Sequence, residues 1–275
     1  MSRIIPEYYN YPLIGRTRND AEIAQANSDP LLIRRGLIQG ASLVHKFGRN
    51  SGVPNGSWEG VLQATAQFTW LQAATTVRVK AGGNVADDGT SSPLGAGAQA
   101  VTIQGLDATG VEVSETVTTA GAAASAYTTT EFIRVYRAWV SAAGTYTGNN
   151  TANIMIEDGS NDLILIAAGE GQTQFCGYTI PLGKTGYLAS VLVQADGAKA
   201  ADFRLFTREN ILETSAPYTA KRLKYYWDGV LGVSVVRTLT PILRIPALTD
   251  IWIEAQGGSV GTEVTADMEI VLYDD

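Results

Sequence analysis

The sequence predicts an all-β protein, built from β-sandwich or jelly-roll-like domains with an extended, partly helical N-terminal arm. Apolar and polar residues alternate in many short runs, β-branched residues are plentiful, and glycine-rich turns separate the runs. The chain has 275 residues, of which 45% are hydrophobic and only 17% are charged, so it can bury at least one large core. We expect an arm over residues 1–55, a first β domain over 56–175 and a second β-sandwich domain over 176–275.

The expected arm begins with prolines and tyrosines, which favour an extended segment. Short helices are predicted over residues 20–26 and 29–44; in the second, Asp29 can cap the helix and Pro30 occupies its first position. Tyrosines exposed to water would be costly, so we expect those of the arm to pack on the body or on a neighbouring copy. They are Tyr8, Tyr9 and Tyr11.

The first β region contains the clearest hairpin of the chain. Apolar residues alternate on both sides of a turn-forming stretch over residues 105–110, so residues 101–119 are predicted to form two antiparallel strands. A glycine- and serine-rich loop is expected over residues 81–98. Further strands are predicted at 76–80, 131–140, 152–157 and 163–167.

The second β region contains seven short strand patterns separated by turn residues, which is typical of a sandwich or jelly roll. The predicted strands are 178–181, 187–195, 202–208, 223–227, 232–239, 250–255 and 266–273.

Residue types that carry chemistry are scarce. His45 is the single histidine and Cys176 the single cysteine, which excludes a cysteine–histidine zinc cluster and argues against a catalytic triad. Gly183–Thr185 is similar to the end of a phosphate-binding loop, but Tyr178 stands where that loop needs a glycine, so a β-turn is the better interpretation. We therefore expect no catalytic residue, no cofactor, no metal and a buried thiol at Cys176.

Charge is distributed unevenly along the chain. The net charge is −7, which does not indicate a nucleic-acid partner. Residues 1–50 and 199–245 are net basic, whereas 51–198 and 246–275 are net acidic. Ordinary surface variation and contacts between basic and acidic faces of neighbouring copies both explain this pattern. No apolar run reaches the length of a membrane span, and no signal-peptide pattern opens the chain.

Interface candidates follow from the enrichment of tyrosine, tryptophan and arginine at protein–protein interfaces. In the expected arm they are Tyr8, Tyr9, Tyr11, Arg34, Arg35, His45, Lys46, Phe47 and Arg49. In the aromatic and basic run over residues 204–227 they are Arg204, Arg208, Lys221, Arg222, Lys224, Tyr225, Tyr226 and Trp227. This second run is also consistent with binding to carbohydrate or nucleic acid, or with an ordinary strand surface.

Four motifs in a fixed order resemble structural proteins encoded by tailed bacteriophages, over residues 45–200. They are HKFGRN, VTIQGLDATGVEVSETVT, EFIRVYRAWV and AAGEGQTQFCGYTIPLGKTGYLASV. The resemblance implies a non-enzymatic virion component, such as a capsid cement, decoration or minor capsid subunit that stabilises the shell. It also implies a homo-oligomer, with a trimer suited to local three-fold positions, bound to the major capsid protein or other virion proteins. Such a protein is assembled in the host cytoplasm and located in the virion.

Two other functions stay open at this level. A tail or fibre-base component that binds a receptor or glycan would use the run over residues 204–227. A hydrolase acting on host polysaccharide would need a catalytic pair of carboxylates, and the sequence contains no pattern that identifies one.

Overall fold

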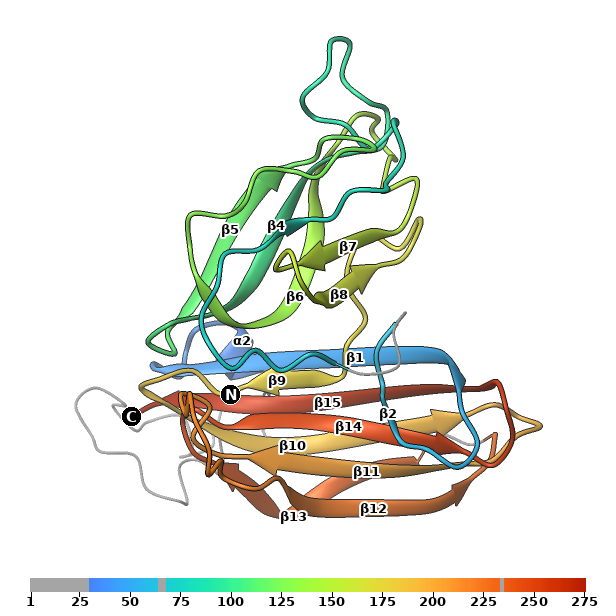
Figure 1. Cartoon of the computed structure of the whole chain (residues 1–275). Coiled ribbons are helices and arrows are strands. Elements are labelled where there is room, and N and C mark those ends of the chain that lie inside the picture. Colours follow the sequence, from blue (N-terminus) through green and yellow to red (C-terminus); the bar gives the residue numbers. More distant parts are fainter. Residues whose placement is uncertain (1–29, 64–67, 233–234) are drawn as a thin grey trace, which may run out of the picture.

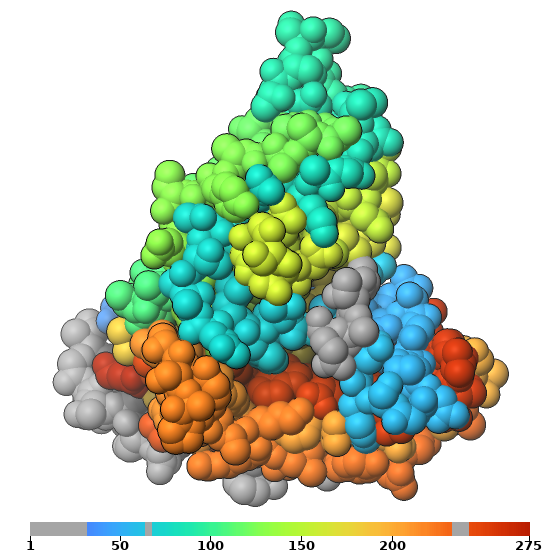
Figure 2. All heavy atoms as spheres, in the orientation of Figure 1, coloured from blue at the N-terminus to red at the C-terminus, as the bar shows by residue number. Residues whose placement is uncertain are grey.

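The structure, a computed structural model of the chain, describes residues 30–63, 68–232 and 235–275. These residues form an almost entirely β protein, which confirms the predicted fold class. The strands form a broad base and a narrower projection that rises from it (Figure 1). Figure 2 shows the outline tapering from the base to a tip formed by the loop between residues 79 and 98.

The base is a β-sandwich of two stacked antiparallel sheets (Figure 1). One sheet has the order β1-β15-β10-β13 and the other the order β12-β11-β14-β2, with β9 also paired to β14. These strands are β1 (Ala41–Val53), β2 (Glu59–Gly60), β9 (Gly177–Thr179), β10 (Lys184–Ala195), β11 (Ala201–Arg208), β12 (Arg222–Val230), β13 (Val235–Ile245), β14 (Asp250–Gly257) and β15 (Thr262–Asp274). Alternating side chains such as Met268 and Ile270 from one sheet, and Phe203 and Ile253 from the other, are fully buried in a shared core.

The projection contains two three-stranded sheets with the orders β5-β4-β6 and β3-β7-β8. Its strands are β3 (Arg78–Val79), β4 (Ala98–Asp107), β5 (Glu112–Thr118), β6 (Phe132–Ala143), β7 (Ile154–Glu157) and β8 (Asp162–Ile166). The predicted hairpin over residues 101–119 is confirmed: β4 and β5 pair antiparallel from Ala100 opposite Thr118 to Leu106 opposite Glu112. Gly110 closes its turn at a φ of 86°, a conformation that favours glycine.

A buried ion pair joins the projection to the base. Arg134 of β6 donates from Nε and Nη2 to the two carboxylate oxygens of Asp250 in β14, each at 2.9 Å. Arg134 also donates to the carbonyl of Leu71 at 2.8 Å, and Thr179 of β9 donates to Asp250 at 2.8 Å. The two charged side chains are 1% and 0% exposed, so charge and hydrogen bonding are satisfied without water.

The partly helical arm needs correction. The helix expected over residues 29–44 is short: α2 (Pro30–Arg34) ends after five residues, and strand β1 begins at Ala41. Gly36 and Gly40 have φ values of 68° and 65°, which end the helix, and β1 then pairs with β15 from Ala41 opposite Tyr273 onward. Long-range strand pairing has therefore overridden a local helix pattern. The helix expected over 20–26 lies outside the described residues.

The end of the expected arm thus forms an edge strand of the base. The arm tyrosines Tyr8, Tyr9 and Tyr11 lie outside the described residues. The division of the chain at residues 55 and 175 stays a prediction.

Candidate functional site

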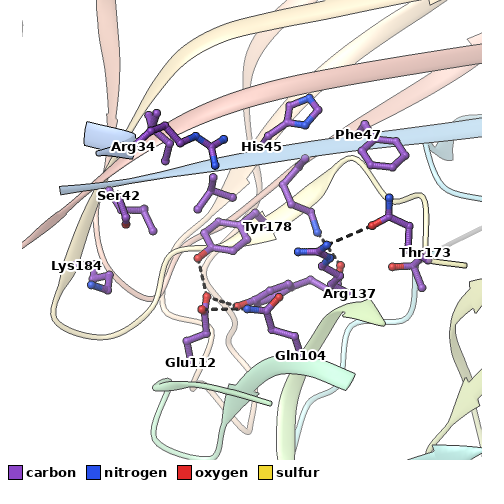
Figure 3. A pocket seen from close by; sticks show the side chains of 16 residues that line it. Arg34, Ser42, His45, Phe47, Gln104, Glu112, Arg137, Thr173, Tyr178 and Lys184 are labelled. Carbon is purple, nitrogen blue, oxygen red and sulfur yellow. Dashed lines mark hydrogen bonds between the residues drawn. The ribbon is translucent and has the colours of Figure 1, made fainter. Parts of the chain in front are cut away.

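A cavity of about 600 Å³ lies between β1 of the base and β5 and β6 of the projection, with β9 at its side (Figure 3). Four interface candidates from the sequence line it together: Arg34, His45, Lys46 and Phe47. This cavity is the candidate site because it combines those residues with charged groups of the projection.

Strand geometry divides the HKFGRN motif between two sides of β1. His45 and Phe47 stack on each other with ring centroids 5.9 Å apart. His45 lies across the β1 ribbon from Tyr178 and Arg137 (Figure 3). Lys46, between His45 and Phe47 in sequence, points to the opposite face because side chains alternate along a strand. Its Nζ donates to the backbone carbonyl of Tyr136 at 2.8 Å.

Lys46 is a buried cation, with 7% of its surface exposed. Burial, the largest cause, and the nearby positive charge of Arg137 together lower its pKa from 10.5 to about 7. Its ammonium also lies 5.2 Å from the centroid of the Tyr136 ring. Lys46 therefore changes its charge near neutral pH.

Glu112 of β5 is the carboxylate that lines this cavity. It accepts hydrogen bonds from the hydroxyls of Tyr136 and Tyr178 at 2.6 and 2.9 Å, and from the Gln104 side-chain amide at 3.1 Å (Figure 3). Burial raises the pKa of both tyrosines well above the ordinary value, so they remain protonated donors. Neutral donors thus hold the Glu112 carboxylate in place.

Further cations surround the cavity. Arg137 of β6 donates to the Gln172 side chain at 3.2 Å and lies 4.9 Å from the centroid of the Trp139 ring. Arg34 at the end of α2 lines the cavity and is exposed, whereas Lys184 of β10 pairs with Asp274 at 2.6 Å. The lining therefore carries more positive than negative charge.

Two arm candidates lie apart from the cavity lining. Arg35 is exposed beyond the end of α2. Arg49 of β1 donates to Glu263 at 2.7 Å, and this hydrogen bond raises the pKa of Arg49.

The candidates over residues 204–227 lie on or beside the five-stranded sheet, and none of them lines this cavity. Arg204 stacks 3.6 Å from the Trp58 ring centroid and pairs with Glu254 at 2.9 Å; Lys221 pairs with the same carboxylate at 2.9 Å. Trp252 donates its indole N–H to Glu254 at 2.9 Å as well, so this carboxylate is fully committed within the protein.

The remaining candidates of this run are mostly paired on the sheet surface. Arg208 contacts Glu213 at 3.4 Å, Arg222 contacts Glu209 at 3.5 Å and the Tyr226 hydroxyl donates to Asp202 at 3.3 Å. Lys224 is partly exposed on β12, and the rings of Tyr225 and Trp227 lie 6.0 Å apart. Trp227 itself is buried in the base core, so its side chain cannot be reached by a partner.

A second cavity, of about 370 Å³, adjoins this run. Aromatic side chains line it: the rings of Trp70 and Trp252 lie 4.9 Å apart, and Tyr218 is exposed at its edge. Arg208 lies 5.6 Å from the Tyr218 ring centroid. This arrangement offers apolar faces beside charged groups.

Sequence reasoning did not identify Glu112, Tyr136, Arg137 and Tyr178 as members of a site. They lie on three different strands, and no local motif connects them to Lys46, which bonds to a residue 90 positions away. The one signal the sequence offered is the strand predicted over residues 131–140, in which neighbouring side chains such as Tyr136 and Arg137 point to opposite faces.

Other types of site are not found in the described part of the chain. No group of three His, Cys, Asp or Glu side chains within residues 30–63, 68–232 and 235–275 is arranged to hold a metal ion. No helix there has the length and apolar character needed to cross a membrane. Cys176 is a free, buried thiol, as expected, and burial raises its pKa well above the ordinary value.

Comparison with known proteins gives little further information. No protein-family model matches the chain, and no curated protein matches it. Among solved structures, a VP2 subviral particle of infectious bursal disease virus aligns with a TM-score of 0.25 and 11% identity, over 84% of this chain and 72% of that chain. The Gx strain of the same virus aligns with a TM-score of 0.21 and 11% identity, over 85% and 77% of the two chains. These scores are too low to indicate a shared fold, so the function has to be argued from the residues of this chain.

Proposed function

We propose that this protein is a non-enzymatic structural component of a tailed-bacteriophage virion, a cement or decoration subunit that stabilises the shell. The observation that carries the proposal is the arrangement of a broad β-sandwich base and a projection joined to it by the buried Arg134–Asp250 pair. A subunit that braces a shell has to transmit force between its parts without a hinge, and a buried, bidentate ion pair resists such bending.

The proposed docking surface is the expected arm, whose described part includes two exposed arginines. Arg34 and Arg35 are exposed at the end of α2, next to strand β1, which forms an edge of its sheet. Exposed arginines and an edge strand are features that suit contact with another subunit. The homo-oligomer, and its trimeric form, belong to this proposal.

The decisive experiment is to locate the protein on intact particles by electron microscopy, comparing wild-type particles with particles that lack it. We expect density on the outside of the capsid, with the base against the shell and the projection outward. Density confined to the tail would contradict the cement role.

Docking is tested separately with purified protein and undecorated capsids. The double substitution of Arg34→Ala with Arg35→Ala should lower occupancy at least about tenfold, as expected for the loss of arginine contacts at an interface. The matched control is Lys80→Ala, which removes an exposed cation from the projection at a position that is not an interface candidate. Equal occupancy for all three proteins would exclude Arg34 and Arg35 as docking residues.

A second candidate function is favoured by the aromatic cavity. A tail or fibre-base protein that binds a glycan would stack sugar rings on exposed aromatic faces. In this cavity Tyr218 is exposed and Trp70 partly exposed, whereas Trp252 is buried in the wall. A glycan array with wild type, Tyr218→Ala and the control Tyr146→Ala tests this. Specific binding that is lost with Tyr218→Ala alone supports the glycan function and counts against a purely cementing role.

A further inference from the structure

The cavity between β1 and the projection contains two cations that lack an anionic partner. Lys184 is paired with Asp274, and Glu112 is held by two tyrosine hydroxyls and an amide. Within the described residues, no carboxylate forms an ion pair with Lys46 or Arg137. These two side chains therefore have no ion-pair partner among the described residues, and Glu112 acts on Lys46 through its charge without pairing with it.

Lys46 is the stronger indication because it is buried. An ammonium has three N–H donors, and the structure gives the Lys46 ammonium one acceptor, the Tyr136 carbonyl. Burying a cation with unused donors is costly unless something else satisfies them. Since Lys46 lines the cavity, an acceptor in the cavity can fill that role.

We propose that this cavity binds an oxyanion group, a carboxylate or sulfate carried by a small polar ligand, between the Lys46 ammonium and the Arg137 guanidinium. A guanidinium presents a planar fork of donors that matches an oxyanion, and an ammonium adds a point charge. The cavity, at about 600 Å³, is much larger than a single ion, so the oxyanion belongs to a larger molecule. Ser42, Gln104 and Gln172 line the remainder and suit a hydroxylated ligand such as an acidic sugar.

Binding is coupled to protonation of Lys46. Its pKa is about 7 in the protein alone, and an adjacent anion favours the charged form, so binding takes up a proton above neutral pH. Affinity for an anion of fixed charge should therefore fall by up to about tenfold per pH unit above pH 7.

The groups that act on the Lys46 ammonium come from several elements. Arg137 of β6 and Glu112 of β5 act on it through their charges. Cys176 and Tyr178 have raised pKa values and stay neutral over this pH range. The charged groups farther round the lining are Arg34, His45 and Lys184. His45 lines the same cavity, so a His45→Gln variant separates its contribution from that of Lys46.

Calorimetric titration of the purified full-length protein tests the inference with three probes: sodium sulfate, sodium D-glucuronate and neutral D-glucose. Sulfate keeps a fixed charge between about pH 6 and about pH 8, so its pH profile reports on the protein. We expect wild type to bind at least one anion and not glucose. Lys46→Met and Arg137→Gln should each weaken binding at least about tenfold, and Lys46→Met should abolish the pH dependence. Lys80→Met, which removes an exposed lysine of the projection, is the charge-matched control.

Each outcome of the titration either supports the proposed site or overturns it. Binding of sulfate alone identifies a sulfate-type ligand, and binding of glucuronate identifies a carboxylate ligand; both support the site. Absence of saturable anion binding, equal binding of glucose, or equal loss in the Lys80→Met control overturns it. Arg137 is exposed, so Arg137→Gln still decides the matter if Lys46→Met fails to fold. The test uses the isolated protein, so its result is independent of where the protein lies in a virion.

Discussion

At the scale of single residues, two buried cations differ in the partners that accept their hydrogen bonds. Arg134 is 2% exposed and meets a carboxylate in a bidentate contact with further hydrogen bonds. Lys46 is 7% exposed and meets a carbonyl, without a carboxylate partner among the described residues. Arg134 therefore stabilises the fold, whereas the Lys46 ammonium retains N–H donors that are available to a ligand.

Breaking the Arg134–Asp250 pair should be strongly destabilising, because either substitution leaves an uncompensated buried charge. We expect Arg134→Ala to lower the free energy of unfolding by about 3–5 kcal/mol in chemical denaturation. The control is Arg222→Ala, whose pair with Glu209 is exposed and contributes less than about 1 kcal/mol. A small effect of Arg134→Ala would show that the projection and the base are held together by other contacts.

Lys46 should make stability depend on pH. Its pKa is lowered in the folded protein from 10.5 to about 7, so between these values the unfolded chain binds more protons than the folded protein. The free energy of unfolding should therefore rise with pH in that window, by up to about 1.4 kcal/mol per pH unit from this group. Lys46→Met should flatten the rise measured by denaturation at several pH values. Lys80→Met should leave it intact, because the pKa of Lys80 is raised rather than lowered.

At the scale of elements, strand β1 shows how one glycine fits a strand into the base. A Cβ at Gly48 would collide with the carbonyl of Val61 and the backbone N of Cys176, two atoms that are hydrogen-bonded to each other at 2.9 Å. Gly52 in the same strand has open space around it. The glycine of the HKFGRN motif is thus required for a close approach of two backbones.

Substitution in β1 should therefore depend on position. We expect Gly48→Ala to lower the thermal midpoint of unfolding by several degrees, corresponding to more than about 2 kcal/mol, because backbone rather than a mobile side chain has to shift. Gly52→Ala in the same strand should change stability by less than about 0.5 kcal/mol. Equal midpoints for both variants would mean that the strand adjusts more freely than its packing indicates.

The elements also show how far the sequence could predict this fold. The β4–β5 hairpin was predictable because alternation and turn residues are local properties. Strand β1 was not, because the pattern over residues 29–44 also suits a helix, and pairing with β15 more than two hundred positions later decides between them. For the cavity, the HKFGRN residues were identified, but their partners on β5, β6 and β9 were not.

At the scale of the whole molecule, the base depends on residues close to the N-terminus of the described chain. Strand β1 pairs with β15 along most of its length and lies on the side of the base that faces the projection (Figure 1). Removing β1 would expose a long edge of β15 and would take the fully buried side chain of Val53 out of the core.

Truncation should accordingly have two different results. Deletion of residues 1–29 should leave circular dichroism and the unfolding midpoint unchanged, because the four described sheets contain no strand before Ala41. Deletion of residues 1–53 should cause unfolding or aggregation, because it removes β1. If the shorter deletion alone abolishes capsid binding, the arm is the docking element; if it also unfolds the protein, these residues contribute to the core.

The sequence by itself determined that this is a β protein with few chemistry-bearing residues, because strand patterns, turn residues and residue counts are properties of the chain alone. Only the tertiary structure decided that Lys46 meets Tyr136 and that Arg134 meets Asp250, contacts that span 90 and 116 positions. The physical reason is that β-sheets bring distant segments together through backbone pairing, which is largely independent of side-chain identity. The Arg134–Asp250 pair and the cavity both lie where the base and the projection meet. No local sequence pattern predicts which residues come into contact there.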